Sequence, residues 1–220
     1  MAFSEYPRLS ERGQGWLRYL HRKATVADRW DRHGRPSDMW DDRSGAPMTS
    51  WHRFDLIDSS YAVAVAAEVT PAWRELYGTI LDCLLERYAS YWAAIDWLEQ
   101  IGPDPRRDRY PAEWLPLIPR AHLGNYDVPG WTANGVEPWG LEMDPVAAQG
   151  NLFYTGFFDL LLGLHLSVTG DRKWNRPFEI VRDGEQAYSY THGTLNQLLA
   201  TQWERRPEGC HCENTKIWPY

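Results

Sequence analysis

A thiol, an imidazole and a carboxylate stand side by side near the end of the sequence. Cys210, His211 and Cys212 are consecutive, and Glu213 follows them. Thiolates and imidazoles bind zinc, but a tetrahedral site usually takes two separated pairs of ligands, and the sequence offers no second pair. A disulfide between Cys210 and Cys212 would close a strained small ring. The residues therefore favour either a catalytic thiol, whose ionisation a neighbour must set, or two buried thiols in a loop.

A cluster of acids lies far upstream, in the stretch "SDMWDDRSG". Asp38, Asp41 and Asp42 are its carboxylates. Clustered charges usually indicate a solvated surface loop. An acid buried among Trp40 and Trp51 would instead have a raised pKa and could protonate a hydroxyl group. Both readings stay open.

Aromatic residues are unusually frequent, with 13 Trp, 12 Tyr and 6 Phe in 220 residues. Most such side chains fill cores and wedge helices together. The surplus could also line a cavity, either for stacking against sugars or for stabilising a carbocation by the negative faces of the rings. Composition does not choose between these two kinds of ligand.

Size and charge exclude several classes of protein. The length allows one sizeable domain, and a formal charge of -7 argues against nucleic acid as a partner. No window approaches the roughly 18 uncharged apolar residues of a membrane span. The most apolar stretch, 152–168, carries Asp159 and His165. Three cysteines, an odd number, make a disulfide framework improbable, so we expect a cytoplasmic protein.

Hydrophobic periodicity predicts helices almost throughout, without convincing strand pairs. A helix is expected after the N-cap candidate Ser10, and Gly170 should end the long apolar one. Pro-rich residues 101–147 are expected to form a functional loop inside a single helical domain spanning 1–220. The predicted helices cover residues 10–30, 54–69, 71–101, 148–170, 171–186 and 189–206.

Several segments resemble the linalool dehydratase/isomerase family. The stretch "CENTKIWPY", residues 212–220, is similar to the family's active-site segment, in which C-E opens a C-x8-C pair. Residues 151–174 resemble the family's long cavity helix, and Asp144 and Pro145 precede it at nearly the family's distance. The similarity runs from about residue 53 to 220, interrupted around 101–135, and is most specific in the last 70 residues.

The resemblance implies an all-α fold, an (α/α)6 toroid or barrel of which this chain supplies roughly the first half. Six helix pairs need more residues than 220, so we expect a further C-terminal segment or a companion chain to complete it. The resemblance also implies a homo-oligomer that works without a cofactor. Its reaction would be the loss or migration of a tertiary allylic hydroxyl group on a monoterpene alcohol, a hydrophobic small molecule.

The family's functional positions carry over one at a time. Cys212 matches the first active-site cysteine, Glu213 the acid that follows it, and the second cysteine would come directly after Tyr220. One of the three N-terminal aspartates would supply the family's acid. The positions that the resemblance assigns to substrate binding are Tyr61, Phe153, Tyr154, Phe157 and Trp218.

Two departures from the family pattern bear on the reaction. Phe157 stands where the family has a cavity histidine, so a general acid–base is replaced by an aromatic wall. This change favours a larger or more apolar substrate and a possible cyclisation. The family's D-x5-Y motif has no clear match. His165 and His192 have no family counterpart and are interpreted as structural, and Cys83 as a small buried hydrophobe.

Two other functions remain as alternatives. A carbohydrate-active toroid of the epimerase or glycosidase type would share the architecture and use the tryptophans for stacking. It would need paired carboxylates and a polar cavity, whereas Phe153, Phe157 and a thiol suggest a dry one. A non-catalytic binding protein on the same fold is consistent with the missing histidine.

Overall fold

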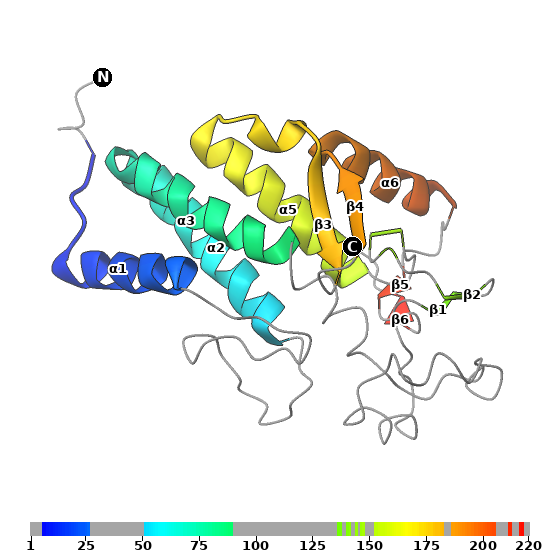
Figure 1. Cartoon of the computed structure of the whole chain (residues 1–220). Helices are drawn as coiled ribbons and strands as arrows, with labels where there is room; N and C mark the ends of the chain where they lie inside the picture. Colours follow the sequence, from blue (N-terminus) through cyan, green and yellow to red (C-terminus); the bar gives the residue numbers. More distant parts are fainter. Residues whose placement is uncertain are drawn as a thin grey trace, which may run out of the picture.

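The computed structural model describes residues 6–26, 51–89, 136–137, 140–141, 144, 146–147, 152–182, 186–205, 211–212 and 216–217. Over these residues the fold is mostly helical, which confirms the expected all-α class (Figure 1). The closure of a toroid stays a prediction. The helices are α1 (Glu11–Thr25), α2 (Trp51–Val69), the short 3-10 helix η2 (Pro71–Trp73), α3 (Arg74–Arg87), α5 (Leu152–Thr169), the 3-10 helix η7 (Lys173–Asn175) and α6 (His192–Arg205).

Helix α1 begins and ends at specific polar contacts. The Ser10 hydroxyl accepts a hydrogen bond from the Gly13 amide at 3.1 Å, as expected for an N-cap. At the other end, the Arg87 guanidinium donates to the carbonyl groups of Ala24 and Val26. An arginine there donates to carbonyl groups that have no partner inside the helix. Its positive charge also interacts favourably with the negative end of the helix dipole. These bonds attach α1 to α3.

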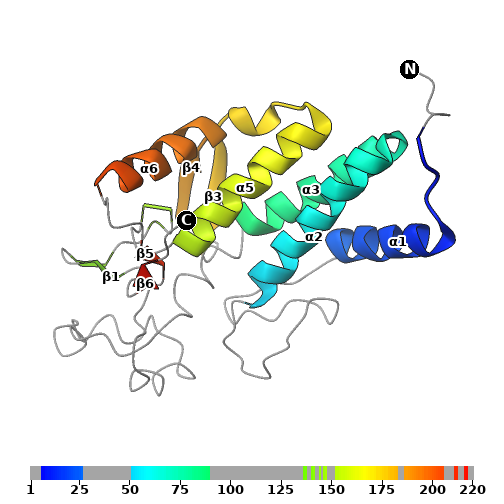
Figure 2. The same cartoon turned by 180° about the vertical axis from the view of Figure 1, so that it is seen from behind.

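Helix α3 is the centre of the helical layer. It packs against α1, α2 and α5, and α5 packs in turn against α2 and α6 (Figures 1 and 2). The start of the η2–α3 unit follows from the sequence. Pro71 occupies the first position of η2, where its missing N–H costs nothing, and α3 continues from there. The fully buried apolar side chains include Ile57 and Val63 of α2, Tyr77, Ile80, Leu81 and Leu85 of α3, and Phe158 and Leu161 of α5.

A row of aromatic rings runs through this core. Tyr88 stacks on Tyr154 with ring centroids 5.0 Å apart and on Phe158 at 5.3 Å. Phe158 meets the edge of Phe178 at 5.6 Å, and Phe178 meets Trp174 at 5.2 Å. Such arrangements add to the stability gained by burial. Part of the aromatic surplus is therefore structural.

The prediction of a helix over residues 171–186 is wrong. Residues Phe178–Arg182 form strand β3, which pairs antiparallel with β4 (Gln186–Tyr190), with Phe178 opposite Tyr190 and Arg182 opposite Gln186. Exposed Glu179 precedes buried Ile180, which is the alternation of a strand. The Asp183–Gly184 pair was a hairpin signal that the helical interpretation overlooked.

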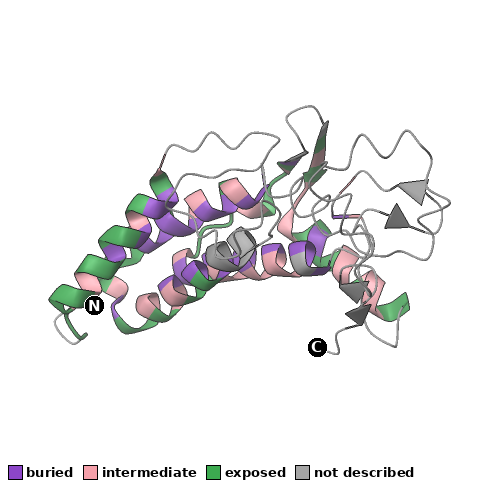
Figure 3. Cartoon of the chain, turned by 90° about the horizontal axis from the view of Figure 1, so that it is seen from below, coloured by how far each residue is buried: buried purple, intermediate pink, exposed green. Residues whose placement is uncertain are grey.

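Helix α2 differs from expectation on one side. The apolar composition of residues 54–69 is typical of a mostly buried helix, but Tyr61, Val65 and Val69 are 43%, 67% and 49% exposed. They are spaced four residues apart and so share one face of the helix. Figure 3 shows exposed residues on the outer sides of the helices and buried ones where helices face one another. None of the described helices is long and apolar enough to cross a membrane.

Candidate active site

The cysteine segment, for which a loop was one of two interpretations, contains two short paired strands. Strand β5 (His211–Cys212) pairs antiparallel with β6 (Lys216–Ile217), with Cys212 opposite Lys216. Cys212 is thus the last residue of β5, at the start of the connection that holds Glu213. A hairpin fixes the backbone on both sides of that connection.

Strand β5 contacts α5, the helix that carries the matched aromatic positions. Figures 1 and 2 both place β5 and β6 near the N-terminal end of α5. The two segments are separated by more than 40 residues of sequence. The structure therefore places the cysteine segment in contact with the helix that resembles the family's cavity helix.

The matched residues of α5 have different surroundings. Tyr154 is fully buried, and its hydroxyl donates to the Tyr88 carbonyl at 3.0 Å. Phe157 is half-buried and packs against the core. Thr155, between them, is 1% exposed, and its hydroxyl has no hydrogen-bond partner among the residues that the structure describes. A buried hydroxyl without a partner is a costly feature and so marks this turn of α5 as unusual.

Two other predicted site residues lie on described helices, and the rest lie outside the described residues. Tyr61 lies on the exposed face of α2. The backbone of Phe153 belongs to α5. Asp38, Asp41, Asp42, Glu213 and Trp218 lie outside the described residues. Within the described part of the chain, no group of three His, Cys, Asp or Glu could hold a metal ion.

Asp144 holds the segment that leads into α5. One of its carboxylate oxygens accepts the amides of Val146 at 2.9 Å and Ala147 at 3.4 Å. The other accepts the hydroxyl of Tyr190, at the end of β4. The Asp-Pro pair was the available signal, because aspartate before such a turn often binds the following amides. The bond to Tyr190 could not be foreseen, since it needs the β3–β4 hairpin.

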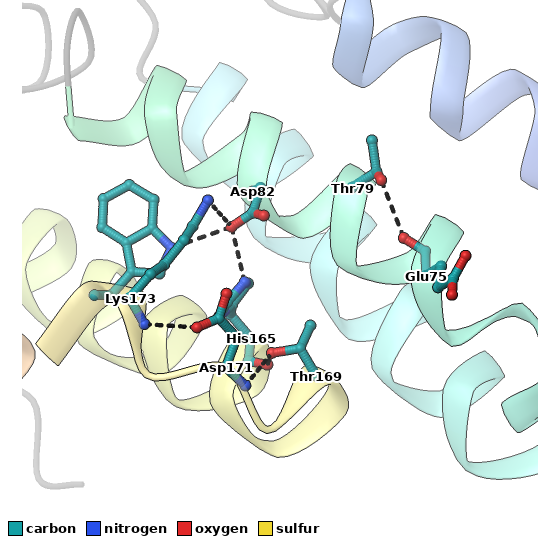
Figure 4. Close-up of polar contacts among 8 residues, drawn as sticks. Glu75, Thr79, Asp82, His165, Thr169, Asp171 and Lys173 are labelled. Atoms are coloured by element: carbon teal, nitrogen blue, oxygen red, sulfur yellow. Dashed lines mark hydrogen bonds and ion pairs between the residues drawn. The ribbon is translucent and has the colours of Figure 1, made fainter.

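A second polar cluster lies between α3 and the end of α5 (Figure 4). One oxygen of Asp82 accepts His165 Nε2 at 2.7 Å, Lys173 Nζ at 2.7 Å and Trp174 Nε1 at 3.2 Å. Burial lowers the pKa of His165, and the nearby Asp82 carboxylate offsets only part of that effect. Because His165 Nδ1 is buried and has no partner within the described part of the chain, the neutral ring with its proton on Nε2 suits the site. These contacts support the structural interpretation of His165.

A similar link joins α5 to α6. Asp159 accepts Asn196 Nδ2 at 2.9 Å and lies 3.4 Å from His192 Nε2. Burial raises the pKa of Asp159, and His192 lowers it by a smaller amount. His192 therefore has a structural partner, as the sequence interpretation assumed.

The neutral state of His165 predicts a loss of stability in acid. Its folded-state pKa lies below the unfolded value of about 6.5. The unfolded chain therefore binds the additional proton first, so stability is complete above about pH 6.5 and declines as pH falls towards the folded pKa. Urea unfolding between pH 7.5 and pH 5 should show this decline, and His165→Gln should make it shallower.

A matched control is available on α1. His21→Gln replaces a half-exposed histidine and should keep the wild-type pH profile. If the His165→Gln variant kept the wild-type dependence of stability on pH, the loss of stability in acid could not be assigned to His165.

Comparison with protein families adds one match. A search of curated proteins found none that matches the chain, and a search of solved structures found none either. The family match covers 131–220 and so includes α5, α6, the β3–β4 hairpin and the cysteine segment, but neither Tyr61 nor the three N-terminal aspartates. As the motifs predicted, residues 131–220 match the linalool dehydratase/isomerase family.

Proposed function

We propose that this protein is a lyase or isomerase that acts on a hydrophobic isoprenoid alcohol or alkene by acid–base carbocation chemistry, without a cofactor. The observation that carries the proposal is the family match, which spans both the Cys212 segment and α5. The contact between β5 and α5 supports it, because the matched positions of the two segments then share one neighbourhood.

The reaction needs few groups. An acid, for which Asp38, Asp41 and Asp42 are the candidates, gives a proton to the hydroxyl oxygen. The carbon–oxygen bond then breaks, with both electrons moving to oxygen. Water departs, and an allylic cation remains. Loss of a proton from a neighbouring carbon to the Cys212 thiolate yields an alkene, and return of that proton to the aspartate restores both groups, so the alcohol becomes alkene and water. Glu213 would assist this proton transfer. Capture of the cation by Cys212 sulfur, followed by elimination, gives the same products.

Aromatic side chains suit the cation in this scheme. Phe153, Phe157 and Trp218 would present rings to the substrate, and such rings attract positive charge in a site that excludes water. The half-buried Phe157 takes the place of a histidine in the family pattern. A phenylalanine ring cannot exchange protons, so the change favours a larger or more apolar substrate. It also favours cyclisation as an outcome of the reaction.

A substrate panel tests this proposal. The purified full chain, treated with a chelator and dialysed, would be incubated with monoterpene and sesquiterpene allylic alcohols and, separately, with oligosaccharides. Gas chromatography should reveal alkene or rearranged alcohol above the level formed with heat-denatured protein. Conversion of the oligosaccharides alone would favour a carbohydrate-active enzyme, and no conversion of either class would favour a binding protein.

A further inference from the structure

A hydrogen bond joins two segments that lie on either side of α5 in the sequence. The hydroxyl of Tyr190, the last residue of β4, donates to Asp144, which lies 46 positions earlier and precedes the helix. Both side chains are half-buried, so the bond is partly shielded from water. A hydroxyl that donates to a carboxylate forms one of the stronger hydrogen bonds in proteins. The bond therefore ties the approach to α5 to the strand pair that follows the helix.

Asp144 also organises the chain that leads into α5. Its other carboxylate oxygen accepts the amides of Val146 at 2.9 Å and Ala147 at 3.4 Å. The side chain of Val146 is fully buried and belongs to the same core as Phe158 of α5. Helix α5 begins only a few residues later, at Leu152. A turn that is held on both its polar and its apolar side therefore restrains the first turn of the helix.

The β3–β4 hairpin provides a fixed point for this bond. Tyr190 is paired with Phe178 of β3, and the Phe178 ring meets Phe158 of α5 edge to face at 5.6 Å. Figures 1 and 2 both show the hairpin beside α5. The hairpin thus holds α5 at two places, by a ring contact in the helix and by a polar bond ahead of it. Two separate attachments restrain both the position of a helix along its axis and its rotation, whereas one would leave the rotation free.

The part of α5 that these attachments restrain is the part next to the cysteine segment. Phe153 and Phe157, which the resemblance assigns to substrate binding, lie in its first two turns, and β5 with Cys212 contacts the helix. Chemical steps depend steeply on placement, since a displacement of about 1 Å can cost about a hundredfold in rate. A small shift of α5 relative to Cys212 would therefore change the proposed reaction.

We propose that Tyr190 is a positioning residue for this reaction. Its hydrogen bond to Asp144 holds α5 in place against the Cys212 segment, and so sets both the turnover rate and the ratio of alkene to rearranged alcohol. Tyr190 does not need to touch the substrate, because it acts through Asp144 and the first turn of α5. The catalytic consequence rests on the proposed function, whereas the restraint on α5 can be measured without a substrate.

Two substitutions in the full chain remove or weaken the bond. Tyr190→Phe keeps the ring and removes the hydroxyl, and should lower kcat by about tenfold, leave KM nearly unchanged and shift the product ratio. Asp144→Asn should have a smaller effect, because its amide oxygen still accepts the two backbone amides and its NH2 group can donate to the tyrosine oxygen. The double variant should be about as slow as Tyr190→Phe, since both changes act on the same bond.

The matched control removes a tyrosine hydroxyl elsewhere in the core. The Tyr77 hydroxyl of α3 is hydrogen-bonded to the Thr70 hydroxyl at 2.6 Å, away from the turn before α5. Tyr77→Phe should also lower stability in urea, because it too loses a buried hydrogen bond. It should nevertheless keep the wild-type kcat and product ratio. Equal changes in kcat and product ratio in both variants would show a general loss of stability, and would overturn the positioning role.

Hydrogen exchange supplies a readout that needs no substrate. Mass spectrometry of the peptides that cover residues 144–157 should show exchange about fivefold faster or more in Tyr190→Phe, because the turn before α5 opens more often. Tyr77→Phe should exchange at the wild-type rate in the same peptides. Circular dichroism would confirm that each variant is folded.

The two readouts separate this inference from the proposed function. Wild-type exchange in Tyr190→Phe would overturn the restraint whatever the activity. Faster exchange with unchanged kcat and product ratio would overturn the positioning role and leave the bond as a purely structural link. If exchange becomes faster but the wild-type chain converts no alcohol, the proposed function fails together with the catalytic consequence, and the restraint on α5 stands.

Discussion

Replacing Cys212 with alanine should reduce turnover of a tertiary allylic terpene alcohol by about a hundredfold or more, the usual contribution of a positioned acid–base group. The proposed chemistry needs a group that exchanges one proton with the substrate or binds the cation, and alanine does neither. Initial rates from gas chromatography, at saturating and at low substrate, would measure the effect. We expect kcat to fall and KM to stay nearly unchanged, because the thiol acts on the reacting atoms.

Two other cysteines serve as matched controls for this variant. Cys83 is half-buried on α3, where burial raises the pKa of its thiol, so Cys83→Ala should keep the wild-type rate. Cys210 lies two positions before Cys212, and Cys210→Ala should also remain active. Full activity in Cys212→Ala, or equal losses in all three variants, would contradict the role given to Cys212.

Replacing Phe158 with alanine should lower the free energy of unfolding by about 3–5 kcal/mol, the usual cost of truncating a buried phenylalanine. Its ring is fully buried and contacts Tyr88, Tyr154 and Phe178. Alanine would leave a cavity where α3, α5 and β3 meet, and would also remove three ring contacts. Urea unfolding followed by circular dichroism would measure the change.

Two controls show whether this cost comes from burial. Phe158→Leu keeps most of the volume and should be considerably less destabilising. Tyr19→Ala removes a ring that is 50% exposed and should change the unfolding free energy little. A small effect of Phe158→Ala would show that the aromatic row does not hold these elements together.

The helices were predictable because their signals are local. Ser10 caps α1 as expected, and Gly170 follows α5 with φ of +72°, a conformation that glycine adopts without steric cost. Pro71 likewise marks the start of the η2–α3 unit. The link between Cys212 and α5 was predictable only through the family motifs, since nothing local connects segments so far apart.

Other features were missed, some because a local signal was misinterpreted and some because they depend on tertiary contacts. The β3–β4 hairpin was hidden by a helical interpretation of residues 171–186, although the Asp183–Gly184 turn signal was present. The Asp82–His165 pair needs α3 and α5 to be in contact, and periodicity does not say which helices pair. The exposed face of α2 was missed because its apolar composition is typical of a buried helix.

Incubation of the wild-type chain with a tertiary allylic terpene alcohol, in water labelled with heavy oxygen, shows whether the protein ionises the carbon–oxygen bond. Ionisation of the carbon–oxygen bond lets solvent water recapture the cation. We therefore predict enzyme-dependent alkene formation together with label in the recovered alcohol, both retained in the presence of a chelator. Alcohol recovered without label and without alkene or rearranged product, from protein shown to be folded, would contradict the account.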